Sequence, residues 1–406
     1  FMLAFLDYLY LFRSSKVFPS RHVKEVLKTL RGLELDEKVH TDPLFAEAFS
    51  LGICDVMPDA TIDIVPIADG GDGILTTLVD ALGGDYHTAT VQGPLGSPVK
   101  ALWGTLADHH TAVIEMAEAA GLRLVEAHQR NPLRMSTYGV GELMARALDA
   151  GYRRMIIGLG GSATNDGGMG LLQALGVRFY DAEGEELMAS GEAMCRVAEV
   201  DASGLDARLR DVDIVVASDV DNPLFGQRGA ARVYAPQKGA SPGEVEQLDE
   251  GLRGYHSAVM QVVGCDYSES RGAGAAGGVG YALIAFLGAH IESGVNLVLS
   301  LVDFERRARG CDLIVTGEGR LDYQTLMGKA PSGVLAVGKR LGINVIAVGG
   351  GVEDSEALVE GGFWRVYATK PEDMSLEEAM KKDTAQQNIR RAASRVAQEL
   401  LSIVSL

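Results

Sequence analysis

The stretch that decides the fold is MIIGLGGSATNDGGMGLLQAL, residues 155–175. Its first five residues, Met155–Leu159, form a short apolar run that is typical of a strand buried on both faces. A glycine-rich loop follows directly, and Met169–Leu175 gives a short helical pattern. Strand, glycine loop and helix in this order predict an α/β fold. The loop should lie at the carboxyl end of a parallel strand, where ligands commonly bind.

Similar apolar segments recur on both sides of this stretch, with helical patterns between many of them. The capping box Ser241-Pro-Gly-Glu244 predicts the start of one long helix. The first twelve residues are apolar but too short to cross a membrane, so we expect a buried strand or a docked helix. The other predicted strands are Ile62–Ile67, Ala112–Met116, Val177–Tyr180, Asp213–Ala217, Asp312–Thr316, Val345–Val348 and Trp364–Tyr367.

Composition excludes several classes of protein. A chain of 406 residues, 47% hydrophobic and 23% charged, is long enough for two or three folded domains. A net charge of −18 argues against binding to nucleic acid, which depends on clustered Lys and Arg. The four cysteines are scattered, and no apolar run reaches the length of a membrane span. We therefore expect a soluble cytoplasmic protein that binds a small molecule and neither nucleic acid nor membrane.

The loop Ala68–Gly73, with the sequence ADGGDG, is the first candidate phosphate site. Its glycines can present backbone N–H groups to an anion, and a predicted helix behind them adds the dipole of its N-terminus. Carboxylates are the ligands that Mg²⁺ prefers, so Asp69 and Asp72 are candidates to hold it. The alternative is a tight turn that only begins a helix.

The loop Gly158–Gly170 has more glycines than a turn needs. Residues 158, 160 and 163 also match G-x-G-x-x-A, with Asp181 placed where a ribose-binding acid would fall, so a dinucleotide-dependent oxidoreductase is an alternative. Against it, the loop runs well past Ala163 and leaves only a short crossover helix. A second match, Gly272–Gly277, follows a polar segment rather than a strand, and is explained as well by close helix packing.

Acids and cations follow several predicted strands. Thr316–Asp322, with the sequence TGEGRLD, is expected as a loop that offers carboxylates beside a guanidinium group, and Lys329 follows nearby. The alternative for this segment is a surface ion pair. Ser218–Pro223 places two acids in one turn, and Ala235–Gly239 offers a lysine in a loop. These clusters suit an anionic substrate or a metal.

Taken together, these motifs resemble the bacterial type I glycerate kinase family, in the same order from about residue 55 to the C-terminus. The resemblance implies ATP-dependent phosphorylation of D-glycerate, in most members at the 2-hydroxyl, in the breakdown of organic acids. The motifs are PIADGGDG (66–73), GPLG (93–96), IEMAEAAGL (114–122), RNPL (130–133), GVGEL (139–143), GLGGSATNDGGMG (158–170), LQALGVRF (172–179), SDVDNPLFG (218–226), PQKGAS (236–241), GAGAAGGVG (272–280) and TGEGRLDYQTLMGKAP (316–331).

The family fold implied by the resemblance has two different α/β domains. Residues 1–90 and 295–406 would build a flavodoxin-like parallel sheet, residues 91–294 would form an inserted α/β domain, and the active site would lie in the cleft between them. The N-terminus departs from the family string A-P-D-S-[FY]-K-G, which only Asp7 and Lys16 faintly echo. A catalytically impaired homologue is therefore a further alternative, and a homodimer is left open.

Phosphoryl transfer needs positioning and charge neutralisation more than covalent chemistry, so the site residues expected here are loop donors, acids and cations. ATP and Mg²⁺ are the expected cofactors. The catalytic candidates are Asp166 as a base, Glu318, Arg320 for a carboxylate or phosphate, and Asp322. The substrate and phosphate candidates are Asp69, Gly70, Gly71, Gly160, Gly161, Ser162, Thr164, Asn165, Asp219, Lys238, Gly277, Gly278 and Lys329; the metal candidates are Asp72 and Asp221.

Overall fold

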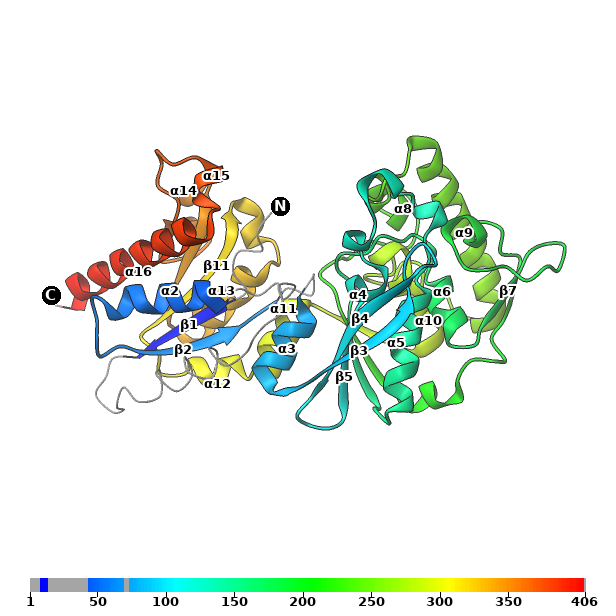
Figure 1. The fold of residues 1–406 in the computed structure, drawn as a ribbon, viewed down its shortest axis with the longest axis horizontal. Helices are drawn as coiled ribbons and strands as arrows, with labels where there is room; N and C mark the ends of the chain where they lie inside the picture. The colour runs from blue at the N-terminus through cyan, green and yellow to red at the C-terminus, as the bar shows by residue number, and fades with distance from the viewer. Residues whose placement is uncertain (1–7, 14–42, 69–72, 405–406) are drawn as a thin grey trace. The chain divides into compact units, whose positions relative to one another are not determined.

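The structure is a computed structural model that describes residues 8–13, 43–68 and 73–404. The chain divides into two compact units (Figure 1). Unit 1 comprises Phe1–Ala68 and Val298–Leu406, and unit 2 is the continuous segment Asp69–Leu297. Both units combine helices with a sheet, as expected for an α/β protein.

Unit 1 contains a five-stranded sheet in the order β13-β12-β11-β1-β2. Strands β11, β12 and β13 are parallel, whereas β1 lies antiparallel between β11 and β2. The carboxyl ends of β2 and β11 therefore meet at the same edge of this sheet. The strands are β1 (Tyr8–Arg13), β2 (Thr61–Pro66), β11 (Leu313–Leu321), β12 (Asn344–Val352) and β13 (Arg365–Ala368).

Helices cover both faces of this sheet, and the alternation of β11 side chains decides which helix meets which face. Leu313 and Val315 pack into a core with helices α2 and α16, whereas Ile314 lies on the side of α13. The helices of unit 1 are α2 (Pro43–Cys54), α12 (Phe304–Ala308), α13 (Ala330–Leu341), α14 (Ser355–Glu360), α15 (Leu376–Ala379) and α16 (Lys382–Val404), while α11 (Gly294–Leu301) spans the boundary between the units.

Unit 2 contains a six-stranded sheet in the order β10-β9-β6-β5-β4-β3. Strands β5, β6, β9 and β10 are parallel, so Glu115, Gly158 and Ala217 end their strands at one edge. A separate pair, β7 and β8, is antiparallel. The strands are β3 (Gly84–Gln92), β4 (Pro98–Leu106), β5 (Thr111–Glu115), β6 (Arg154–Gly158), β7 (Arg178–Tyr180), β8 (Glu199–Asp201), β9 (Asp213–Ala217) and β10 (His290–Glu292).

The hairpin β3–β4 sets the boundary between the units. β3 pairs with β4 along its whole length, from Gly84 opposite Leu106 to Gln92 opposite Pro98. A boundary at residue 90 would cut through this strand. The division therefore falls at Ala68–Asp69. The hairpin is part of the sheet of unit 2, and the helix α3 (Ile74–Leu82) before it packs against that sheet.

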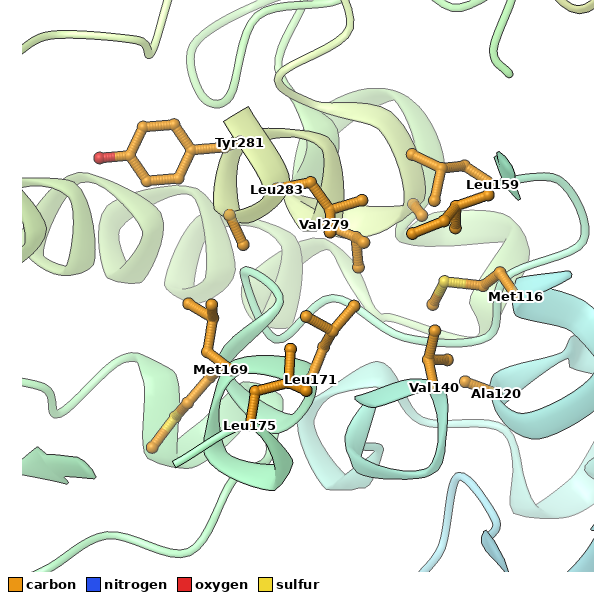
Figure 2. Close-up of a cluster of buried hydrophobic side chains, with 14 of the residues drawn as sticks. Met116, Ala120, Val140, Leu159, Met169, Leu171, Leu175, Val279, Tyr281 and Leu283 are labelled. Atoms are coloured by element: carbon orange, nitrogen blue, oxygen red, sulfur yellow. The ribbon is translucent and has the colours of Figure 1, made fainter. Parts of the chain in front are cut away.

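Helix α5 packs against β3 and β5 of this sheet, α6 packs on α5, and α10 packs on α6. Figure 2 shows the centre of this core, where Val140 of α5, Leu171 of α6 and Val279 of α10 point toward one another. Helix α9 begins at the predicted capping box, in which the Ser241 and Glu244 side chains each bond the other's backbone. The helices are α4 (Met116–Ala120), α5 (Tyr138–Asp149), α6 (Met169–Ala174), α7 (Gly191–Met194), α8 (Ala230–Tyr234), α9 (Pro242–Val263) and α10 (Val279–Leu287).

None of the described helices is both long enough and apolar enough to cross a membrane. The four cysteines form no disulfide, and Cys265 is exposed.

Candidate active site

The glycine loop after β6 has an accessible rim, Gly160–Ser162, and a buried floor, Ala163–Gly170. Gly160 and Ser162 are half-buried and Gly161 is exposed, whereas every residue from Ala163 to Gly170 is buried. The Gly161 carbonyl accepts a hydrogen bond from the backbone N–H of Leu122 at 2.8 Å, which connects the rim to the segment that follows α4. Of the candidates on this loop, Gly160, Gly161 and Ser162 can therefore meet a ligand. Thr164 and Asn165 have no exposed surface.

Asp166 is the hub that holds the floor of the loop. Its Oδ2 accepts hydrogen bonds from the N–H and hydroxyl of Thr137, both at 2.8 Å, and from the Gly170 N–H at 3.2 Å. Its Oδ1 accepts from the Gly168 N–H at 3.1 Å. Burial raises the pKa of Asp166, while these four bonds oppose the shift. A carboxylate that is 0% exposed and already saturated fits a positioning role better than the predicted role of a base that touches substrate.

Lys238 lies beneath the same loop. It is 2% exposed, and its Nζ lies 2.8 Å from Ser162 Oγ and 2.7 Å from the carbonyl oxygen of Thr164. Burial lowers the pKa of this amine to about 7, although the charge of Asp166 acts in the opposite direction. Lys238 therefore contacts the loop itself, and Ser162 stands between it and the surface.

Gly277 and Gly278 pack against the loop rather than lining its rim. Both are buried with positive φ angles of 72° and 99°. A Cβ at Gly277 would lie 2.3 Å from the Thr164 carbonyl oxygen, and one at Gly278 would lie 2.8 Å from Gly167 Cα. The Gly277 carbonyl also accepts a hydrogen bond from the Gly167 N–H at 3.0 Å. Close backbone packing accounts for these glycines, which is the alternative noted for this segment.

A buried acid occupies the N-terminus of α3, where the sequence suggested a phosphate. Glu115, at the end of β5, is 3% exposed, and its carboxylate accepts hydrogen bonds from the N–H groups of Gly73 and Leu75 at 3.0 and 3.2 Å. A carboxylate in this position already satisfies the helix dipole, so these two donors are not available to a phosphate. The candidates of the preceding loop, Asp69, Gly70, Gly71 and Asp72, lie outside the described residues.

In unit 1 the segment 316–321 was expected to be a loop, and this is wrong. β11 continues to Leu321, because Glu318 and Arg320 lie opposite Gly349 and Gly351 of β12. Glu318 accepts a hydrogen bond from the Thr325 hydroxyl, and its Oε2 lies 3.3 Å from Lys329 Nζ. Burial raises the pKa of Glu318 against the effect of these partners. Glu318 and Lys329 thus form a half-buried acid–cation pair at the end of the strand.

The other two candidates of this segment have local partners. Arg320 is exposed and forms an ion pair with Glu353, as the surface alternative predicted. Asp322 caps the 3₁₀ turn Tyr323–Leu326 by accepting a hydrogen bond from the Gln324 N–H at 2.9 Å. Arg320 thus already has an acidic partner, whereas Asp322 holds the turn that carries Thr325.

The acids after β9 were candidates for substrate and metal. Asp219 is exposed at the same sheet edge as the glycine loop, and Asp221 is exposed with its Oδ1 3.4 Å from Arg228. Within the described part of the chain, no three His, Cys, Asp or Glu side chains gather into a group that could hold a metal ion. The described residues therefore do not fit a resident metal site.

Comparison with known proteins agrees with these motifs. A family model described as "Glycerate kinase family" matches residues 41–401. The chain belongs to the glycerate kinase family. Glycerate kinase of Bacillus subtilis (strain 168) is 45% identical over 337 residues, which cover 83% of this chain and 88% of that protein. Glycerate 2-kinase of Escherichia coli (strain K12) is 43% identical over 356 residues, covering 87% and 93%.

A solved structure of this family has the same fold. It is a protein of Salmonella typhimurium LT2, provisionally assigned as glycerate kinase 2, with a TM-score of 0.79 and 40% sequence identity. The similarity covers 91% of this chain and 97% of that one. The glycerate kinase family therefore accounts for both units of the chain.

The dinucleotide alternative fails on the geometry of the same loop. After β6 ends at Gly158, ten residues separate it from α6, and the next strand, β7, belongs to the separate two-stranded sheet. Asp181 is 6% exposed and pairs with Arg196 at 2.5 Å, so it is not open to a ribose. This βαβ unit lacks the compact crossover and the free acid of a dinucleotide site.

Two residues that shape the site were missing from the sequence-based set. Thr137 lies just before α5 and reaches Asp166, and its hydroxyl also accepts a hydrogen bond from the Leu171 N–H at 2.9 Å. Glu115 ends an otherwise apolar strand. An acid at the end of a buried strand is a signal that could have identified Glu115. The partner of Thr137 is 29 residues away, so no local pattern points to it.

Proposed function

We propose that this protein transfers the γ-phosphoryl group of ATP to the 2-hydroxyl of D-glycerate and releases 2-phosphoglycerate. The observation that carries the proposal is the family match over residues 41–401, together with 43–45% identity to enzymes named glycerate kinase and glycerate 2-kinase. The four cysteines form no disulfide with one another, which suits a reducing compartment, so the proposal includes the cytoplasm.

Each unit offers groups suited to anions. In unit 2, the exposed rim Gly160–Ser162 offers backbone donors and a hydroxyl for phosphate oxygens. In unit 1, Lys329 and Arg320 are partly or fully exposed cations that can hold a carboxylate or a phosphate. The buried Asp166 and Lys238 do not meet the ligand in this proposal. They hold the rim in place, so that the donors need not reorganise during phosphoryl transfer.

ATP enters this proposal as its magnesium complex, which is a substrate. Mg²⁺ keeps several waters and binds to phosphates with only one or two carboxylates, so a kinase needs no closed metal cage. The proposed protein ligands are the acids Asp72 and Asp221.

The test is an assay of the full chain with D-glycerate, ATP and Mg²⁺, in which ADP is coupled to NADH oxidation and the product is identified by ³¹P NMR. We expect 2-phosphoglycerate. Calorimetric titration with ATP-Mg²⁺ and with NAD should show binding of the former only. NAD binding without ADP formation would overturn the kinase assignment, and 3-phosphoglycerate would overturn the choice of hydroxyl.

A further inference from the structure

Transfer to an alcohol requires a group that accepts the hydroxyl proton as the new bond to phosphorus forms. The sequence suggested Asp166 for this role. Its side chain is fully buried, and four protein donors occupy its two oxygens. A base must lie within hydrogen-bond reach of the proton it takes, directly or through one bridging group. The glycine loop contains another pair that meets this condition.

Ser162 and Lys238 form that pair. Ser162 Oγ lies 2.8 Å from Lys238 Nζ, and the second contact of the amine, at 2.7 Å, is the carbonyl oxygen of Thr164. A neutral amine can donate one N–H to this carbonyl while its lone pair accepts the Ser162 hydroxyl proton. The positions of Lys238 Nζ, Ser162 Oγ and the Thr164 carbonyl oxygen are therefore compatible with two states: a charged Lys238 that donates to Ser162, and a neutral Lys238 that accepts from it. Only Ser162 of the two reaches the surface.

The surroundings of Lys238 favour the neutral amine. Burial lowers its pKa to about 7, and Asp166 is the charged group that opposes this shift. Gly239 packs against the backbone of Arg130, but the Nε of Arg130 donates to the Val125 carbonyl. From α8, which packs on the turn Pro236–Lys238, Arg232 is paired with acids of α9. At neutral pH a large fraction of Lys238 can thus accept a proton.

We propose that Ser162 and Lys238 form the proton relay for phosphoryl transfer, a role that rests on the proposed kinase function. The substrate oxygen forms the new bond to the γ-phosphorus, and the bond between that phosphorus and the bridging oxygen of ADP breaks, with its electron pair leaving on ADP. The substrate hydroxyl proton passes to Ser162 Oγ, and the proton of Ser162 passes to Lys238 Nζ. After product release the ammonium returns a proton to solvent through Ser162.

The test measures kcat and KM of the full chain between pH 5.5 and 9 for the wild type, Ser162→Ala, Lys238→Met and Lys238→Arg. For the wild type, kcat should rise with pH up to about 7 and then level, because protonated Lys238 cannot accept a proton. Ser162→Ala and Lys238→Met should each lower kcat by about 10²-fold, with little change in KM, and the rise with pH should disappear. Lys339→Arg is the matched control, since Lys339 also donates to a carbonyl oxygen at 2.7 Å but lies in unit 1.

Lys238→Arg separates a relay from a structural support. Arginine keeps the positive charge and the donors but cannot lose a proton in this range. A relay predicts that Arg is as inactive as Met, whereas a support predicts that Arg restores activity. Ser162→Ala removes few atoms, so it answers the question even if a Lys238 variant fails to fold. Wild-type kcat and pH profile in Ser162→Ala would overturn the relay alone, and a wild type that makes no ADP with glycerate would overturn the proposed function as well.

Discussion

Replacing Thr137 with valine should destabilise unit 2, because it removes the hydroxyl that links Asp166 to helix α6 beneath the glycine loop. This hydroxyl donates to Asp166 and accepts from the Leu171 N–H, and all three groups are buried. Loss of a hydrogen bond to a charged group costs about 1.5–3 kcal/mol, and the Leu171 N–H left without a partner costs about 1–3 kcal/mol more. Since such terms are not additive, we expect unit 2 to lose about 3 kcal/mol.

The measurement uses the two tryptophans, one in each unit. In a Trp364→Phe background, Trp103 reports only on unit 2, where it is buried against His87. With a denaturant slope of about 3 kcal/mol/M, the urea midpoint of this signal should fall by about 1 M. Thr137→Ser keeps the hydroxyl and loses one methyl group, so the free energy of unfolding of unit 2 should fall by only about 1 kcal/mol in this variant. Equal midpoints for the two variants would refute the argument that the hydroxyl holds the loop.

Three further outcomes test other parts of the structure. Gly277→Ala should lower the same midpoint more than Gly264→Ala, because both glycines have positive φ but only the Cβ at 277 would meet a backbone carbonyl, at 2.3 Å; equal effects would show that the loops are not tightly packed. Glu318→Gln should lower kcat by about 10²-fold in the coupled assay without changing the melting of unit 1, as expected for a positioned acid, and normal turnover would remove it from the site. Arg307→Ala should destabilise unit 1 by about 1 kcal/mol in a fluorescence melt of its tryptophan, since Arg307 donates three hydrogen bonds to β2, two to the Asp63 carboxylate and one to the Ile64 carbonyl, whereas Arg309→Ala should change little.

The buried strands could be predicted from the sequence because each is a short segment rich in apolar residues. Asp213–Ala217 has the same bounds in the prediction and in the structure. The hairpin β3–β4 gave no such signal, because β3 is an edge strand whose residues are mostly exposed and polar. The segment 316–321 was assigned as a loop because its glycines and charges are typical of one. Its extended conformation depends on pairing with β12, which local sequence does not contain.

For the candidate site, residue type indicated which loops matter but not which side chains face a ligand. The sequence placed Ser162 and Asp166 in the loop Gly158–Gly170 and Lys238 in a separate loop, Ala235–Gly239. In the structure Lys238 contacts Ser162 and lies near enough to Asp166 for their charges to interact. Their burial differs, however, because η5 (Pro236–Lys238) and the loop Gly272–Gly278 pack against the floor and leave the rim open. Burial of this kind depends on contacts between segments more than 70 residues apart, so no motif reveals it.

The order in which the two units can fold follows from the insertion of unit 2 between β2 and β11. Unit 2 is continuous and is complete once residue 297 has emerged from the ribosome. Unit 1 must wait, since Gly52 of α2 is buried against the backbone of Arg390 and the Asp55 carboxylate pairs with the same arginine. At about 5–20 residues per second, the nascent α2 stays unpaired for tens of seconds. A chaperone that binds apolar helices would find its longest-lived target there, and a ribosome stalled when residue 297 has just emerged from it should carry a folded unit 2 beside an unfolded α2.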